Sequence, residues 1–290
     1  YPYFLALLYK IGGGHISFVI FCQHLIGAAS AWLVYMIARM FFRPGIALLA
    51  GVFAGLYWPF LYFEADLLIV TLIVFLDLLF LYFIVRAMRT SRAGYLIAAG
   101  LVLGLSAVAR PNILVMIPAL PFVFWLWPEG KNREKALRQK ICIRQTILVC
   151  GAAALVILPV LVRNWVIGRD IVPIASQGCV NFYIGNNPEA DGRTAIVPGT
   201  RWDWWGGYED AIRLAEREAW RKLKPSEVSN HYFRKGAGFV LSHPDRSIPL
   251  LGKKMYLFWA AGERSNNKYI YFFLHQGGMG KIPLPGFWLM

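Results

Sequence analysis

Residues 67–85 read LLIVTLIVFLDLLFLYFIV, and this run decides the class of fold. It carries a single charged side chain, Asp77, and its length is close to the ~20 apolar residues that a helix needs to cross a bilayer. The sequence therefore predicts a bundle of about six transmembrane helices, the other five at residues 16–38, 45–62, 94–109, 112–127 and 145–163. The short segments at 94–109 and 112–127 are expected to tilt little or to enter only partway, and a leading piece at 5–11 to form a juxtamembrane helix.

The composition of the whole chain supports the membrane class. Of the 290 residues, 58% are hydrophobic and only 16% are charged, which leaves too little polar surface for a soluble protein of this size. A net charge of +14 raises the possibility of a nucleic-acid partner. We exclude that partner because the basic residues lie largely in short loops between apolar segments, where they set membrane orientation. The four cysteines lack metal-ligand spacing and are interpreted as packing residues: Cys22, Cys142, Cys150 and Cys179.

The loops alternate in charge along the chain. Three of them are basic, and the positive-inside rule places them in the cytoplasm. The FEAD stretch at 63–66, Arg110 and everything after Arg163 are then expected on the opposite side of the membrane. The basic loops carry Arg39 and Arg43, then Arg86, Arg89 and Arg92, and finally Lys131, Arg133, Lys135, Arg138, Lys140 and Arg144.

These patterns predict an all-α polytopic membrane protein, a helical bundle with a small mixed extracytoplasmic insert. The bundle is expected over residues 1–163, the polar insert over 164–247, and a returning interfacial or membrane segment over 248–290. Within the insert, residues 171–185 are predicted to be strand-like and turn-rich, and residues 208–223 and 226–242 to be helical. Val228, Tyr232 and Val240 are expected to face inward on the second of these helices. Because the chain opens at Tyr1 inside an apolar phrase, we expect it to be a fragment of a longer protein.

An acidic pair, Glu64 and Asp66, stands at the mouth of the third apolar segment. One interpretation is structural, because Asp66 can cap free amides at the start of that segment. The other is chemical: a general base, or a carboxylate that helps to hold a metal ion near a phosphate. No cofactor follows from the sequence, and a divalent metal ion is left open. The polar residues inside the spans, Gln23, His24 and Asp77, are interpreted as helix-packing groups.

Four cations are expected near the outer interface: Arg110, Arg163, Lys253 and Lys254. Arg110 can simply snorkel toward the headgroups. The positive-inside rule disfavours arginine on this side, however, which favours an anionic partner, and a guanidinium fork suits a phosphate. The sequence therefore predicts a cationic cluster suited to a lipid headgroup or a lipid-linked phosphate.

Residues 181–192, NFYIGNNPEADG, form a polar stretch on the same predicted side. Asn, Gly and Pro favour an ordered turn, while the spacing fits neither a calcium loop nor a phosphate loop. The stretch is equally compatible with a structural and a binding role. Downstream, Trp202, Trp204 and Trp205 suit membrane-interface anchoring or stacking against sugar rings.

Three phrases resemble the bacterial dolichyl-phosphate-mannose-protein-mannosyltransferase-like group of GT-C glycosyltransferases, which is also similar to the lipid A aminoarabinose transferases. They are YPYFLALLYKIGG, LVLGLSAVARPNILVMIPAL and RNWVIGRDIVPIASQGCVNFYIGNNPEADG, and the later KKMYLFWAAGERSNN adds to the likeness. The resemblance implies a membrane enzyme of the bacterial cell envelope, in the inner membrane. It would transfer a sugar from a polyprenyl-phosphate donor to a glycan, lipid or protein acceptor on the extracytoplasmic face.

The resemblance also implies roles for particular residues. The main catalytic acid is expected upstream of Tyr1, and Glu64 and Asp66 match a second outer loop where the fold often places another acidic pair. Donor-phosphate or site-shaping roles fall to Arg110, Lys254 and Glu263, and contacts with sugar to Asn186, Asn187 or Glu189. The alternative is a transporter or flippase of lipid-linked saccharides, which would use the same outer cations and intramembrane polar residues. A non-catalytic assembly subunit is a third possibility.

Overall fold

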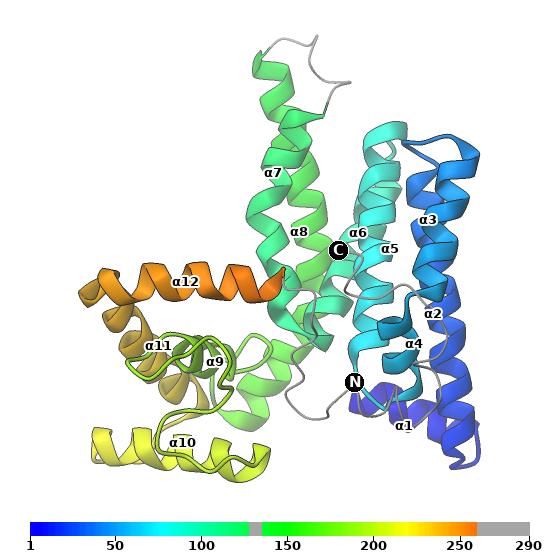
Figure 1. Ribbon diagram of the computed structural model, residues 1–290. Helices are drawn as coiled ribbons and strands as arrows, with labels where there is room; N and C mark the ends of the chain where they lie inside the picture. The colour runs from blue at the N-terminus through cyan, green and yellow to red at the C-terminus, as the bar shows by residue number, and fades with distance from the viewer. Residues whose placement is uncertain (128–134, 260–290) are drawn as a thin grey trace. The chain divides into compact units, whose positions relative to one another are not determined.

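The computed structural model describes residues 1–127 and 135–259 and contains two compact units, one ending at Val160 and the other beginning at Leu161. The first unit is helical, which confirms the predicted class (Figure 1). Its elements are α1 (Pro2–Ile11), α2 (Ile16–Ala38), α3 (Pro44–Leu56), α4 (Trp58–Ala65), α5 (Val70–Thr90), α6 (Ala93–Ala109), η1 (Pro111–Val115), α7 (Met116–Leu126) and most of α8 (Lys135–Gly168).

The predicted spans differ in how well they fit a bilayer. Among the described residues, α2, α5 and α8 are each long and apolar enough to cross it, whereas α6 and η1–α7 are shorter. The predicted span at 45–62 is broken into α3 and α4, which meet at an angle of 44°. The break falls at Tyr57, whose backbone is extended, just before Pro59 in the first turn of α4. Proline is tolerated in a first turn and not in a helix interior, so the sequence favours a new helix here.

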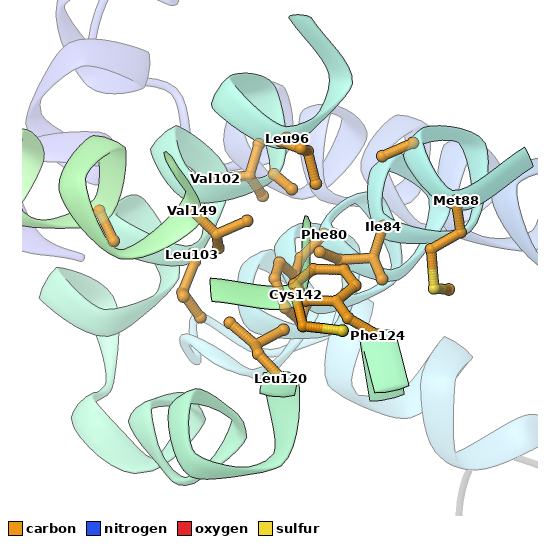
Figure 2. Packing of buried hydrophobic residues seen from close by; sticks show 13 residues of the cluster. Phe80, Ile84, Met88, Leu96, Val102, Leu103, Leu120, Phe124, Cys142 and Val149 are labelled. Atoms are coloured by element: carbon orange, nitrogen blue, oxygen red, sulfur yellow. The ribbon is translucent and has the colours of Figure 1, made fainter. Parts of the chain in front are cut away.

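The core of the first unit is an apolar cluster built by α5, α6, α7 and α8 (Figure 2). Its largest members include Phe80, Leu103, Leu120 and Phe124, and Cys142 packs among them. The cysteine thus has the packing role that the sequence predicted for it.

Two glycines spaced four residues apart, Gly100 and Gly104, let α6 lie directly against α8. A β-carbon at Gly100 would collide with the carbonyl oxygen of Val149, and one at Gly104 would lie 2.8 Å from the carbonyl oxygen of Ala153. Small residues at this spacing allow close backbone approach inside membranes, where van der Waals packing holds helices together. The spacing therefore fixes the α6–α8 contact.

A polar contact joins α5 to α6 within the same bundle. The hydroxyl of Ser106 donates a hydrogen bond of 2.5 Å to Asp77 Oδ1. An ionisable residue inside a span is costly unless it is paired on the inner side of the bundle. The contact confirms that Asp77 is a helix-packing group.

The basic segments that connect helices of the bundle lie together at one end of the first unit. The guanidinium of Arg89 lies 5.2 Å from the centre of the Phe41 ring, and that ring lies edge-on to Trp127 at 6.4 Å. Arg138 stacks over Trp125 at 4.3 Å. The three basic segments thus share one end, as the topology prediction requires, although Lys131 and Arg133 lie outside the described residues. The side of the membrane that this end faces stays a prediction.

The second unit is formed by the end of α8 and four further helices: α9 (Gly178–Gly185), α10 (Trp204–Ala219), α11 (Pro225–Ser242) and α12 (Pro244–Phe258). The described part of this unit contains no strand, so the strand-like part of the prediction for 171–185 is wrong, whereas bends and a turn do occur at residues 173–177. Val180 and Tyr183, one helical turn apart, pack with Val228 and Tyr232 of α11. Helical spacing of the apolar residues therefore prevailed over their strand propensity.

Inward-facing positions on α11 agree largely with the prediction. Val228 and Tyr232 are buried, and the Tyr232 hydroxyl donates a hydrogen bond of 2.7 Å to the carbonyl of Ala211 on α10. Val240 is only partly buried, and its neighbour Phe239 is buried more deeply. The hydrogen bond satisfies a phenol that would otherwise be costly to bury.

The carboxylate of Glu227 caps the start of α11. Its carboxylate accepts two hydrogen bonds from Arg221, of 2.8 and 3.0 Å, and one of 2.8 Å from the backbone amide of Lys224. These bonds, first that from Arg221 and then that from Lys224, lower the pKa of Glu227 to about 2. Because the folded pKa lies below the ordinary value of ~4.3, the stabilisation is present above that value and is lost as the pH falls toward 2.

We therefore expect the protection of α11 amides from hydrogen exchange, corrected for the intrinsic rate, to fall between pH 5 and pH 3. Glu227→Gln should lower protection at pH 5 and flatten this dependence. Glu209→Gln, which changes an exposed acid of α10, should leave the dependence in place. An unchanged pH dependence in Glu227→Gln would assign the effect to another group.

Candidate functional site

Gln23 of α2 fixes the corner between α4 and α5 in the first unit. Its side chain is 1% exposed and donates two hydrogen bonds, of 2.9 Å to the carbonyl of Glu64 and 2.7 Å to that of Asp66. Its oxygen accepts a bond of 2.9 Å from the Tyr1 hydroxyl. The Gln23 amide thus provides hydrogen-bond donors for backbone carbonyls at the end of α4, where the helix supplies none. This confirms its packing role and fixes the backbone that carries the acidic pair.

The carboxylate of Glu64 is buried against α2 and hydrogen-bonded to His24. Glu64 Oε2 lies 2.8 Å from His24 Nδ1, and the two side chains are 9% and 45% exposed respectively. Gly27, one turn along α2, makes room for the carboxylate, because a β-carbon there would collide with it. The His24–Glu64 pair is therefore a built contact that requires glycine at position 27.

The other acid, Asp66, lies between α4 and α5. Its Oδ1 accepts a hydrogen bond of 3.0 Å from the amide of Leu67, and the residue that precedes α5 is Ile69. Helix α5 begins at Val70, three residues after the start of the apolar run, so its N-cap position is Ile69 and Asp66 stands three residues before that position.

The chemistry available to the His24–Glu64 pair is proton transfer. A carboxylate that is hydrogen-bonded to one imidazole nitrogen orients the ring and stabilises its protonated form, leaving the second nitrogen to act on a substrate. The pair offers two donors to a metal ion, and in the described residues no three His, Cys, Asp or Glu side chains gather around such an ion. Sequence reasoning assigned His24 to packing and missed this partnership.

Arg110 occupies the end of α6, where the backbone becomes extended before η1. Its amide donates a hydrogen bond of 2.7 Å to the carbonyl of Ser106, and its side chain is exposed. By helix direction, α6 begins at the end that carries the basic segments, so its last residue lies toward the opposite end. The structure therefore leaves the Arg110 guanidinium accessible to an anion.

In the second unit, Arg163 borders a cavity of about 390 Å³ that Asp170 and Pro225 also line. Its guanidinium donates a hydrogen bond of 3.2 Å to the side-chain oxygen of its neighbour Asn164. Asn164 in turn donates one of 2.9 Å to the carbonyl of Val172. Arg163 is exposed at the edge of this ordered turn.

The predicted binding stretch 181–192 folds as α9 followed by an ordered turn. Asn187 is 2% exposed, donates hydrogen bonds of 2.9 Å to the carbonyls of Tyr183 and Ile184, and accepts one of 2.8 Å from the amide of Glu189. Its side chain closes the end of the helix, which is a structural role. The Glu189 side chain is exposed.

Asn186 and Lys254 are brought together. Lys254 Nζ donates to the carbonyl of Gly185 and, over 3.2 Å, to the side-chain oxygen of Asn186, which ties α12 to α9. Burial lowers the pKa of the Lys254 ammonium. Its neighbour Lys253 is exposed, and Glu263 lies outside the described residues.

Comparison with known proteins identifies the chain from its first unit. No curated protein and no solved structure matches it. A family model described as dolichyl-phosphate-mannose-protein mannosyltransferase matches residues 1–163, more than half of the chain and the part that holds the His24–Glu64 pair, Asp66 and Arg110. Such enzymes are multi-pass membrane glycosyltransferases that take the sugar from a polyprenyl-phosphate-linked donor. The chain therefore belongs to the dolichyl-phosphate-mannose-protein mannosyltransferase family.

Proposed function

We propose that the protein transfers a sugar to an acceptor on the extracytoplasmic face of a bacterial inner membrane, as a relative of the lipid A aminoarabinose transferases. The observation that carries this proposal is the His24–Glu64 pair where α2 meets α4, in which the carboxylate is buried and the imidazole is exposed. Helix direction places it toward the end of the first unit opposite the basic segments. Family membership does not favour the transporter or flippase alternative.

In the proposed reaction, an acceptor hydroxyl gives its proton to a base and attacks the anomeric carbon of the donor. The bond from that carbon to the phosphate oxygen breaks, and its electron pair leaves with the polyprenyl phosphate. We assign base or base-orienting roles to His24 and Glu64, and a supporting role near the same corner to Asp66. The departing phosphate needs positive charge, for which Arg110, Arg163, Lys253 and Lys254 are candidates on the predicted outer side.

The remaining predicted residues are assigned to shaping the substrate site. Asn186 and Glu189 have polar groups at or near the surface, whereas Asn187 acts by closing α9. Glu263 keeps its predicted site-shaping role. Chelation of the purified enzyme tests whether a divalent ion serves the donor phosphate.

The purified full-length protein is expected to release polyprenyl phosphate when given a polyprenyl-phosphate sugar and an acceptor fraction from the cell envelope. Much slower release is expected with donor alone. Monodisperse protein that releases no polyprenyl phosphate from any sugar donor under these conditions would contradict the proposed activity.

Topology is tested separately, in a variant without native cysteines. A cysteine at the exposed Arg193 of the second unit should react with a membrane-impermeant maleimide in intact spheroplasts. A cysteine at Lys140, on α8 close to the basic segment, should react only after permeabilisation. The reverse pattern would overturn the extracytoplasmic assignment.

A further inference from the structure

A second cavity lies wholly within the second unit, between α9 and the start of α10. Its volume is about 330 Å³, and Val180, Ile184, Val197 and Ala211 contribute apolar surface to it. Ligand sites for small molecules span roughly 300–1,000 Å³, so this cavity is large enough for one small group. Neither the His24–Glu64 pair nor any of the predicted cations lines it.

Two amide side chains line the cavity and take no part in the hydrogen bonds that hold the described fold together. Gln177 and Asn181 stand four residues apart, which places them on one face of the helical turn. Within the described part of the chain, neither side chain hydrogen-bonds to another protein group, whereas Asn186 and Asn187 nearby do. Each amide supplies donors and an acceptor, and hydroxyl groups need both.

The facing wall of the cavity is polar but fixed. Thr200 Oγ1 donates a hydrogen bond of 2.8 Å to the carbonyl of Val197, and Asp203 Oδ1 accepts one of 2.6 Å from the amide of Gly206. These bonds hold the loop that leads into α10, with Asp203 as the N-cap of that helix. The cavity wall is thus preorganised.

An aromatic side chain completes the lining. Trp202 is 80% exposed although it borders the cavity, and Tyr208 lines the cavity from the first turns of α10. The exposed indole thus presents an apolar face at the border of the cavity. A ligand with an apolar face would cover the indole, while its polar edge reaches the amides.

Charge then selects the class of ligand. Asp203 is the only charged residue among those lining the cavity in the described part of the chain, and the nearest arginine in sequence, Arg201, is engaged elsewhere. The Arg201 guanidinium donates hydrogen bonds of 2.8 and 3.1 Å to the Asp210 carboxylate. A phosphate or other anion would meet no available cation here. A neutral ligand with hydroxyl groups fits.

We propose that this cavity binds a neutral sugar ring of the acceptor, with one face of the ring on Trp202 and its hydroxyls on Gln177 and Asn181. The inference rests on the proposed function and adds to it a saccharide-bearing acceptor. The sugar of the donor has the same chemistry, so the experiment must separate the two sources.

Binding is tested first, without any transfer reaction. Full-length protein in nanodiscs is mixed with a panel of methyl glycosides of neutral hexoses, pentoses and N-acetylhexosamines, and saturation-transfer NMR is recorded. We expect at least one glycoside to bind and Trp202→Ala and Asn181→Ala to lose the signal. Trp220→Ala, which removes a 94% exposed indole at the other end of α10, should keep it. No binding across the panel, or binding unaffected by Trp202→Ala, would overturn the proposal.

Kinetics then identify the source of the ring. Trp202→Ala should raise the KM for the acceptor ~10-fold, because a lost aromatic contact is worth about one such factor, and should leave the KM for the donor unchanged. A raised donor KM with an unchanged acceptor KM would assign the ring to the donor and overturn the acceptor claim. Tight binding of a peptide acceptor lacking sugar to the same residues would also overturn it. Glycoside binding by protein that transfers nothing would contradict the proposed function and leave the cavity assignment standing.

Discussion

Glu64→Gln is expected to lower the turnover of sugar transfer by ~10²–10⁴-fold, the usual contribution of a positioned general base or acid. Glutamine keeps the size of the side chain and can still hydrogen-bond to His24, so the α2–α4 contact should survive. What it removes is the negative charge that orients and stabilises the imidazole. Turnover is measured as polyprenyl phosphate released at saturating donor and acceptor, alongside the melting temperature.

The pair should behave as one unit. If His24 and Glu64 share a single proton-transfer task, the double variant His24→Gln/Glu64→Gln should be about as slow as the slower single variant. Glu209→Gln, which changes an exposed acid of the second unit, serves as the matched control and should keep full turnover. Full turnover in a well-folded Glu64→Gln would remove the pair from the mechanism and leave it as a packing contact.

Gly27→Ala tests the same pair without altering either member. The added methyl group would overlap the Glu64 carboxylate, so the carboxylate must move away from His24. Turnover should therefore fall even though both chemical groups remain. Gly55→Ala is the control, because a β-carbon there would meet Ala31 at an ordinary 3.5 Å. Equal turnover in the two variants would show that the position of the carboxylate does not matter.

The apolar runs predicted the helices of the first unit well, because lipid requires each spanning segment to satisfy its own backbone hydrogen bonds. The run at 67–85, for example, became α5 with Asp77 paired to Ser106. Composition also gave the all-α class. The break at Tyr57 followed from Pro59, a signal that is readable in the sequence but was outweighed by the hydropathy of the surrounding segment.

Contacts between segments were beyond prediction because they depend on the register of one helix against another. His24 and Glu64 are forty residues apart, and only the packing of α4 on α2 brings them to 2.8 Å. Asn187 is a different case, because its amide closes the end of its own helix α9 through carbonyls three and four residues earlier. In 171–185, the mixture of Val, Ile, Tyr and Phe suggested a strand. That prediction was wrong because β-propensity is context-dependent, and the packing of this segment on α11 is not visible in the sequence pattern.

Gly100→Ala is expected to destabilise the first unit by about 1–3 kcal/mol or more, the usual cost of overpacking. The new β-carbon would collide with the carbonyl oxygen of Val149 and lie 2.6 Å from the β-carbon of Ala152. A backbone atom cannot swing aside as a long side chain can, so the whole of α8 must move away from α6. Adding Gly104→Ala, with contacts of 2.7 and 2.8 Å on Val156 and Ala153, should worsen the loss.

The effect is measured as a lower melting temperature and loss of the monodisperse peak in detergent. Gly151→Ala gives the opposite expectation on the partner helix, because no described atom outside the helix's own backbone lies within 4 Å of its β-carbon position. There alanine relieves the conformational cost of glycine inside a helix, so stability should rise by up to ~1 kcal/mol. If Gly100→Ala and Gly151→Ala shift the melting temperature alike, close packing of α6 on α8 is not what holds this bundle together. Opposite shifts would show that the glycines of α6 are needed for the contact with α8. They would exclude the explanation that small residues are simply tolerated anywhere in the spans.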